Sequence, residues 1–199
     1  GYSATYGVTL GGNFVHSNFM GTGNRLAVNL QGGKYQKVYD ASYTDAYRTV
    51  DGLSRQLQLS YLDSKQYTST ASQFSTTTLS AGISWGYLIS ELQRVTFGVT
   101  YQQADLATSY LSSAQARAWV LANGGESIDP IAQIDKTQVR SLDLLAGWQY
   151  DSRNATLFPT RGTRFGASFT VSVPQSDVEY YIAGLDFSKY IPLFGRWIF

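Results

Sequence analysis

Hydrophobic and polar residues alternate along most of this chain, in segments of about ten residues separated by turn-rich stretches. In the clearest segment, Leu57, Leu59 and Tyr61 occupy one parity while Gln56 and Gln58 occupy the other. Successive side chains of a β-strand point to opposite faces, so this pattern predicts strands with one apolar and one polar face. Helical periodicity is rare, and the chain is therefore predicted to be all-β.

The alternation predicts nine full strands that follow one another as an antiparallel meander. Their apolar positions lie within residues 6–14, 26–30, 39–43, 53–61, 79–85, 95–101, 142–150, 165–173 and 181–187, and the run from Arg196 is a candidate tenth strand. Turns are predicted at residues 21–24, 51–52 and 159–162. In the long connection 105–140, the alanine-rich segment 112–123 ends at Gly124 and Gly125, which predicts a short glycine-capped helix.

The polar positions of these strands carry mostly Ser, Thr, Gln, Gly and Asn, whereas the exposed face of a soluble sheet is usually rich in Lys and Glu. Aromatic residues such as Trp85, Tyr101 and Trp148 recur near the ends of the apolar segments. Both features favour a transmembrane β-barrel over a soluble sandwich. We expect Leu57, Leu59, Ile83, Phe97, Val99, Leu144 and Phe169 to face lipid, and Gln56, Gln58, Ser84, Asp143 and Asp186 to face the lumen.

Arg55 falls on the apolar parity, where a guanidinium at the middle of a bilayer costs about 2–4 kcal/mol. It lies three residues from Gly52, so the sequence predicts that its side chain reaches the membrane interface beside a turn.

Length and charge narrow the function classes further. The chain has 199 residues, which suits one domain, and 15 basic against 14 acidic residues give a formal net charge of +1. That balance argues against nucleic acid as a partner. Cysteine is absent, and no run of 18 apolar residues could form a transmembrane helix.

Candidate enzyme chemistry is weak. His16 is the only histidine and has no partner at catalytic or metal-ligand spacing, and Gly21-Thr22-Gly23 lacks the rest of a phosphate-binding loop. Asp177 and Glu179 have no supporting histidine. The sequence therefore predicts no enzyme activity, no cofactor and no metal. Arg153, Arg161 and Arg164 surround one turn and form either a solvated rim or a docking surface for anionic head groups or other domains.

Several segments resemble the BamA family of bacterial outer-membrane protein assembly factors. They are residues 18–24, which contain Gly21, Gly23 and Asn24; residues 45–54, which contain Asp51 and Gly52; residues 158–164, which contain Pro159, Arg161 and Gly162; and residues 177–181. The resemblance extends over essentially the whole chain, including the connection that bears the predicted helix.

This resemblance implies the N-terminal half of the family's C-terminal barrel domain, with the three glycine-containing turns on the periplasmic side and the helix in an extracellular loop. It also implies location in the bacterial outer membrane and a non-enzymatic role in folding and inserting β-barrel proteins. The partners that it implies are outer-membrane lipids, unfolded β-barrel substrates, and accessory lipoproteins that bind through periplasmic POTRA domains.

The chain departs from the family in lacking POTRA domains, a Val-Arg-Gly-Phe motif and most of the first barrel strand. Residues 1–199 are thus expected to be one part of a single barrel domain, without either strand of the family's lateral gate. An odd number of strands also argues against a closed bacterial barrel. The expected open edge is the first strand, with Tyr6, Val8, Leu10 and Phe14 on its apolar parity. The alternatives are a small complete ten-stranded barrel that acts as a passive pore or adhesin, and a barrel hydrolase.

Overall fold

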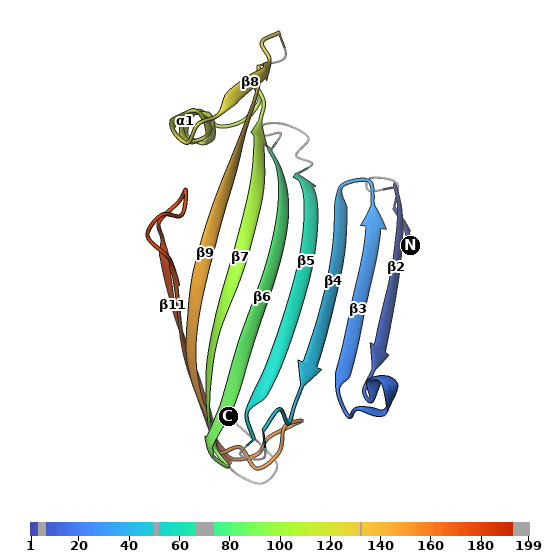
Figure 1. The fold of residues 1–199 in the computed structure, drawn as a ribbon, viewed down its shortest axis with the longest axis vertical. Helices are drawn as coiled ribbons and strands as arrows, with labels where there is room; N and C mark the ends of the chain where they lie inside the picture. Colours follow the sequence, from blue (N-terminus) through green and yellow to red (C-terminus); the bar gives the residue numbers. More distant parts are fainter. Residues whose placement is uncertain (4–6, 50–51, 67–73, 132, 193–199) are drawn as a thin grey trace.

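The computed structural model describes residues 1–3, 7–49, 52–66, 74–131 and 133–192. These residues form one curved antiparallel sheet, in which β5 is seen face on and β11 edge on in Figure 1. The strands are β1 (Tyr2–Ser3), β2 (Gly7–His16), β3 (Arg25–Gly33), β4 (Gln36–Asp45), β5 (Ser54–Gln66), β6 (Phe74–Ser90), β7 (Gln93–Thr108), β8 (Glu126–Asp129), β9 (Ile134–Asp151), β10 (Gly162–Ser172) and β11 (Tyr181–Tyr190). The helices are η1 (Phe19–Gly21) and α1 (Ala114–Ala122).

The strand order is β1-β2-β3-β4-β5-β6-β7-β9-β10-β11, with β8 paired to β9 beside this path. Nine of the described strands have nine or more residues, as the alternation predicts. The order begins at β1 and ends at β11, and no pairing joins these two ends, so the sheet does not close on itself within the described residues. The candidate tenth strand at Arg196 and the edge residue Tyr6 lie outside the described residues.

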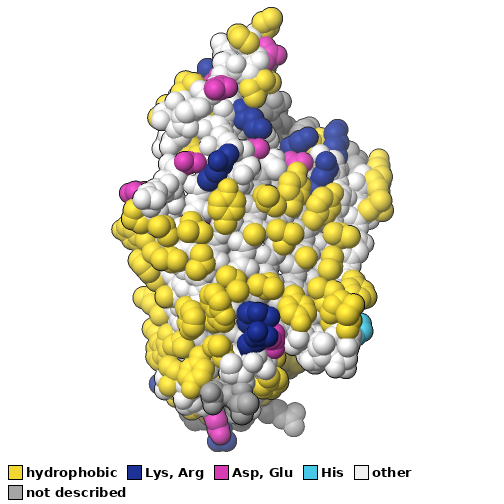
Figure 2. Space-filling model, in the orientation of Figure 1, with side chains coloured by type: hydrophobic (Ala, Val, Ile, Leu, Met, Phe, Trp, Pro, Cys, Tyr) yellow, Lys and Arg dark blue, Asp and Glu magenta, His cyan; other side chains and the backbone are white. Residues whose placement is uncertain are grey.

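Strand register places the expected lipid-facing residues on one side of the sheet. Leu57 pairs with Ile83, Ile83 with Val99, and Val99 with Leu144. Phe97 pairs with Ala146, which also pairs with Phe169. We call this side the apolar face, and Figure 2 shows it covered by hydrophobic side chains. Gln56, Gln58, Ser84, Asp143 and Asp186 have the opposite parity and lie on the polar face.

The sheet has no apolar interior of its own. Among the described residues, the only buried hydrophobic side chain is Val120, which lies in α1 and is 1% exposed. Leu59, Phe97, Leu144 and Phe169 are all exposed on the apolar face. Burial of apolar surface is the main favourable contribution to folding, so another apolar phase must cover this face.

The predicted helix forms and is capped at both ends. The Ser113 side chain accepts a hydrogen bond from the Ala116 backbone N–H at 3.2 Å. Gly124 adopts a positive φ of 75°, and the Gly125 N–H donates to the Val120 carbonyl at 2.9 Å, which completes a Schellman motif. The flanking strands β7 and β9 extend further than predicted, so the connection spans residues 109–133 instead of 105–140. No helix of the described residues is long and apolar enough to cross a membrane.

Candidate functional site: the apolar face, the turns and the open edge

Two ion pairs bound the apolar face along the β4–β5 hairpin. Asp45 and Arg55 are paired in register at one end, and Lys37 and Asp63 at the other. The closest N···O distances are 3.9 Å and 3.8 Å. Arg55 and Asp63 are eight residues apart on β5, about 26 Å at about 3.3 Å per residue. In a barrel whose strands tilt by about 35–45°, this length projects to about 20 Å along the membrane normal, slightly less than the apolar band of about 25 Å that membrane barrels present to lipid.

Aromatic pairs lie beside both charged rows. Tyr39 stacks on Tyr61 with 5.7 Å between ring centroids, next to the Lys37–Asp63 pair. Trp85 stacks on Phe97 at 5.8 Å, and Trp85 is also the register partner of Arg55. Aromatic rings with one polar edge concentrate at membrane–water interfaces, so these two rows mark the borders of the membrane-facing band.

A second arginine joins the ion pair at one border. Arg48, in the connection between β4 and β5, lies 3.8 Å from the same Asp45 carboxylate oxygen that Arg55 approaches. Asp45 is 8% exposed, whereas Arg48 is exposed. The sequence identified Arg55 on the apolar parity but did not indicate that Asp45, ten residues earlier, lies opposite it.

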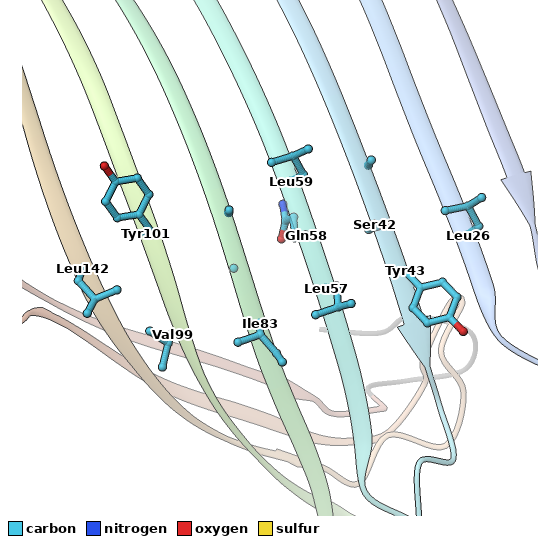
Figure 3. A pocket seen from close by; sticks show the side chains of 13 residues that line it. Leu26, Ser42, Tyr43, Leu57, Gln58, Leu59, Ile83, Val99, Tyr101 and Leu142 are labelled. Atoms are coloured by element: carbon cyan, nitrogen blue, oxygen red, sulfur yellow. The ribbon is translucent and has the colours of Figure 1, made fainter.

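A hollow of about 560 Å³ lies on the apolar face directly next to this group. It forms because Ala41 and Ala81, which are small, flank Leu59 in one row of the sheet. Figure 3 shows Leu57, Leu59 and Ile83 projecting from the near side of their strands while Gln58 lies behind β5. The other residues that line the hollow are Leu26, Ser42, Tyr43, Gly82, Val99, Tyr101 and Leu142.

The three predicted glycine turns lie at one end of the sheet (Figure 1). In the first, Gly21 and Gly23 both have positive φ, and the Gly23 N–H donates to Asn18 Oδ1 at 2.6 Å. Asn24 ties this turn to the next hairpin, because its Nδ2 donates to the Tyr43 hydroxyl at 2.6 Å. Asn18 was not singled out in the sequence, although an Asn that opens a glycine-rich turn often bonds to the backbone further on.

The second turn is held by Thr49 and Gly52. The Gly52 N–H donates to the Thr49 carbonyl at 3.1 Å, and Gly52 has a φ of 82°, a conformation that favours glycine. Asp51, which precedes it, lies outside the described residues.

Asn154 organises the third turn, which contains Pro159, Arg161 and Gly162. Its Oδ1 accepts hydrogen bonds from the backbone N–H groups of Thr160 and Arg161, at 3.0 Å and 3.1 Å. Gly162 has a φ of 114°, and a Cβ there would overlap the Ser152 carbonyl oxygen. Asn154 was not identified from the sequence, because these two hydrogen bonds span six and seven residues.

The three arginines near this turn do not share one environment. Arg153 binds Asp151 with a closest distance of 2.7 Å, and that hydrogen-bonded carboxylate raises the pKa of Arg153. Arg164 lies on the polar face, 3.8 Å from Asp186. Within the described part of the chain, Arg161 has no ion pair and is exposed. The three arginines therefore do not form a single cationic surface.

On the polar face, Asp143 fastens the connection between β10 and β11. Asp143 is 5% exposed, and its Oδ2 accepts a hydrogen bond from the Tyr180 hydroxyl at 2.7 Å. Burial, and then the hydrogen bond to Asp143, raises the pKa of the Tyr180 hydroxyl. Asp177 anchors the same connection, since its Oδ2 accepts from the Arg140 backbone N–H at 2.7 Å. Asp177 thus has a structural partner on β9.

The edge strand β2 is only partly covered. β1 pairs with Val8 and Gly7, and the Thr9 N–H donates to the Gly1 carbonyl at 2.8 Å. Beyond Thr9, no described strand pairs with the outer side of β2. Val8, Leu10 and Phe14 are exposed on its apolar face, and the open edge is shorter than the whole strand.

His16 and the Gly21–Gly23 segment both have structural contacts in the β2–β3 region. His16 contacts the rings of Phe14 and Phe19, with centroid distances of 6.3 Å and 6.2 Å. Gly21, Thr22 and Gly23 form the β2–β3 turn, with Thr22 Oγ1 donating to the Phe19 carbonyl at 2.6 Å. No group of three or more metal-ligating side chains occurs in the described ranges.

A one-layer antiparallel sheet with an uncovered apolar face, aromatic borders and a polar opposite face defines the wall of a transmembrane β-barrel. The family model for the Omp85 superfamily domain matches residues 18–199, so the chain belongs to the Omp85 superfamily. It is a β-barrel protein of the bacterial outer membrane.

The chain is similar to two BamA proteins over nearly its whole length. The outer membrane protein assembly factor BamA of Neisseria meningitidis serogroup B is 25% identical over 195 residues, covering 97% of this chain and 24% of that protein. The crystal structure of BamA from Haemophilus ducreyi lacking POTRA domains 1–3 is similar with a TM-score of 0.78 and 28% identity, covering 96% of this chain and 36% of that one. The chain thus spans about a quarter of the length of the curated relative.

Proposed function

We propose that this chain is part of the wall of a larger outer-membrane barrel that folds and inserts other β-barrel proteins. The observation that carries the proposal is that the described residues form an open sheet of nine long strands without an apolar core, in a chain similar to a BamA assembly factor over nearly its whole length. β2 and β11, the outermost long strands, run in the same direction, so direct pairing between them would be parallel, which bacterial barrels avoid.

The role proposed for the chain is structural and non-enzymatic. An unpaired strand edge in hydrocarbon leaves backbone N–H and C=O groups without partners, and an incoming strand satisfies them by β-augmentation. In the BamA family the seam that opens lies between the first and last barrel strands. The edges at β2 and β11 are proposed to pair with further strands of the same barrel. The chain would then be part of the barrel wall, and the opening seam would be formed by other strands.

The proposed partners follow from the two faces and the two ends of the sheet. Outer-membrane lipids cover the apolar face, and unfolded β-barrel proteins are the substrates of the complete machine. The three glycine turns, marked by Gly21, Gly23, Asn24, Asp51, Gly52, Pro159, Arg161 and Gly162, are proposed to be periplasmic. On that side, POTRA domains would connect the barrel to accessory lipoproteins. The net charge of +1 gives no support to nucleic acid binding.

Depletion of the protein in its own bacterium tests the proposal. We expect several unrelated outer-membrane β-barrel proteins to fall together in abundance, measured by quantitative mass spectrometry of outer membranes, while outer-membrane lipoproteins stay constant. If only the uptake of small solutes falls and the other barrels stay at normal levels, the chain belongs to a passive pore and the assembly function is wrong.

A further inference from the structure

We propose that the apolar face holds one anionic phospholipid, of the phosphatidylglycerol class, at a site that begins at Arg48 and Arg55. The phosphate lies against the two guanidinium groups, and an acyl chain lies in the hollow between β4 and β7. This inference rests on the location of the chain in the outer membrane and does not depend on the proposed assembly function.

The described residues at this site have one basic side chain more than acidic ones. Arg48 and Arg55 contribute +2 and Asp45 contributes −1, and Asp51 of the same connection lies outside the described residues. At the opposite border, the Lys37–Asp63 pair sums to zero, and Lys65 lies two residues further along β5. A phosphodiester carries one negative charge, so a phosphatidylglycerol matches the excess positive charge of the described residues at the first group.

Hydrogen-bond donors at the site also remain unfilled. The distances from Asp45 to the two arginines, 3.8 Å and 3.9 Å, are longer than hydrogen bonds to a carboxylate. The side chains of Arg48 and Arg55 are 56% and 26% exposed, so part of each remains open to a head group. A guanidinium has five N–H donors in a planar fork that suits phosphate oxygens. The two side chains can therefore bind a phosphate without losing the contact to Asp45.

The hollow continues from this group along the direction that an acyl chain would take. Tyr43 and Leu57 line it and form the register row next to Asp45 and Arg55. Its volume of about 560 Å³ is in the range of sites that bind small ligands, and its lining is almost entirely apolar. Ala41 and Ala81 provide the depth, because larger side chains at these two positions would fill it.

The position of Arg55 along the membrane normal suits the head group of a phospholipid. Arg55 shares its row with Trp85 and Phe97, at the border where head groups begin. Figure 2 shows basic and acidic side chains side by side within the hydrophobic surface towards that end of the sheet. This is the end of the turns proposed to be periplasmic, so the lipid belongs to the inner leaflet of the outer membrane.

The test uses the protein purified from outer membranes in a mild nonionic detergent. Native mass spectrometry measures how much added phosphatidylglycerol or phosphatidylethanolamine stays bound. We expect one phosphatidylglycerol to be retained by the wild type, in clear preference to phosphatidylethanolamine. Arg48→Gln should reduce retention about tenfold, because it removes one charge-assisted contact and leaves the Asp45–Arg55 pair in place.

Two further variants separate the parts of the site. Ala81→Leu fills the hollow without changing any charge and should also reduce retention. Lys37→Gln removes a cation from the same strand at the other border and should retain the lipid like the wild type. Heat-modifiable gel migration shows in each case that the variant is folded.

The proposal is wrong if folded Arg48→Gln and Ala81→Leu both retain phosphatidylglycerol as the wild type does. Equal retention of the two lipids by the wild type would also overturn it, since the charge argument requires an anionic head group. Displacement of the lipid by soluble glycerophosphoglycerol, which has no acyl chains, would contradict the role of the hollow.

Discussion

Leu59 and Gln58 are neighbours in β5 that lie on opposite faces of the sheet. Leu59 is midway between the charged residues Arg55 and Asp63 and is therefore the residue of β5 nearest the middle of the membrane-facing band. Gln58 projects from the polar face, where water can solvate a charge. The same substitution at the two positions thus compares the two environments directly.

We expect Leu59→Arg to lower the free energy of unfolding in phospholipid vesicles by about 2–4 kcal/mol, because the guanidinium must enter hydrocarbon. Gln58→Arg should change it by less than about 1 kcal/mol. Guanidinium chloride titration of the protein refolded in vesicles measures both values. Equal losses at the two positions would mean that the apolar face does not contact lipid.

Tyr180 provides a pH-dependent contact at the residue scale. Its raised pKa means that the neutral hydroxyl is favoured while the residue is bound to Asp143. The contribution of this hydrogen bond to folding stability is fully present below the ordinary tyrosine pKa of about 10. It is lost as the pH rises through the raised pKa of Tyr180 in the folded protein. The connection 173–180 should therefore detach from β9 only in strongly alkaline solution.

The measurement is an ultraviolet difference titration of the wild type against Tyr180→Phe. The difference spectrum should show one tyrosine that ionises at higher pH than free N-acetyltyrosinamide, and proteolysis within residues 173–180 should increase over the same range. A difference spectrum that titrates with the free compound would contradict the bound state of Tyr180.

At the scale of elements, the antiparallel meander separates the connections into two groups. The turn around Arg161 lies at one end of the sheet, and the connection with α1 lies at the other (Figure 1). Because the chain has no cysteine, single cysteines at exposed positions can report the two sides.

We expect Gln115→Cys in α1 to react with a membrane-impermeant maleimide in intact cells, whereas Arg161→Cys should react only after the outer membrane is permeabilised. Both residues are exposed, so the difference tests topology instead of burial. Labelling of Arg161→Cys from outside would reverse the orientation assigned to the glycine turns.

The sequence predicted the nine long strands and α1, because apolar alternation and capping residues are local signals. It did not predict the full lengths of β6 and β9. Both extend into segments such as 76–78 and 135–138, where polar residues occupy both parities. These extensions are held by ladder hydrogen bonds and by the helix connection, as when Thr137 Oγ1 donates to the Asn123 carbonyl at 2.6 Å.

The candidate site was predictable only in part for the same reason. Strand parity predicted that Arg55 lies on the apolar face, and Arg55 is the register partner of Trp85 on that face. Its pairing with Asp45 depends on the register of the β4–β5 hairpin, which hydropathy does not specify. The hollow depends on Ala41 and Ala81 in two strands separated by β5, which become neighbours only when the sheet forms.

For the whole molecule, the two free edges determine how the isolated chain behaves. Unpaired backbone groups do not persist in hydrocarbon, and two chains can satisfy them by joining edge to edge. We expect the isolated 199-residue chain, refolded in detergent, to form oligomers through β2. Asn13 and Asn29 are register partners on β2 and β3, which makes them a matched pair for crosslinking.

Asn13→Cys should form disulfide-linked dimers on oxidation, because it lies on the edge strand. Asn29→Cys should not, because β3 is paired on both sides. Sedimentation measures the oligomeric state of the unmodified chain. A monodisperse monomer with slow amide exchange along both β2 and β11 would contradict the open-edge structure.

Val120 is the only hydrophobic side chain buried in the described part of the chain, and this changes what stability means for the protein. In a soluble domain, apolar groups leave water by packing on each other, so the sequence largely determines the melting temperature. Here most of that transfer occurs when the sheet meets acyl chains. Folding is thus thermodynamically linked to lipid in the way that a receptor is linked to its ligand, and the melting temperature varies with the composition of the bilayer.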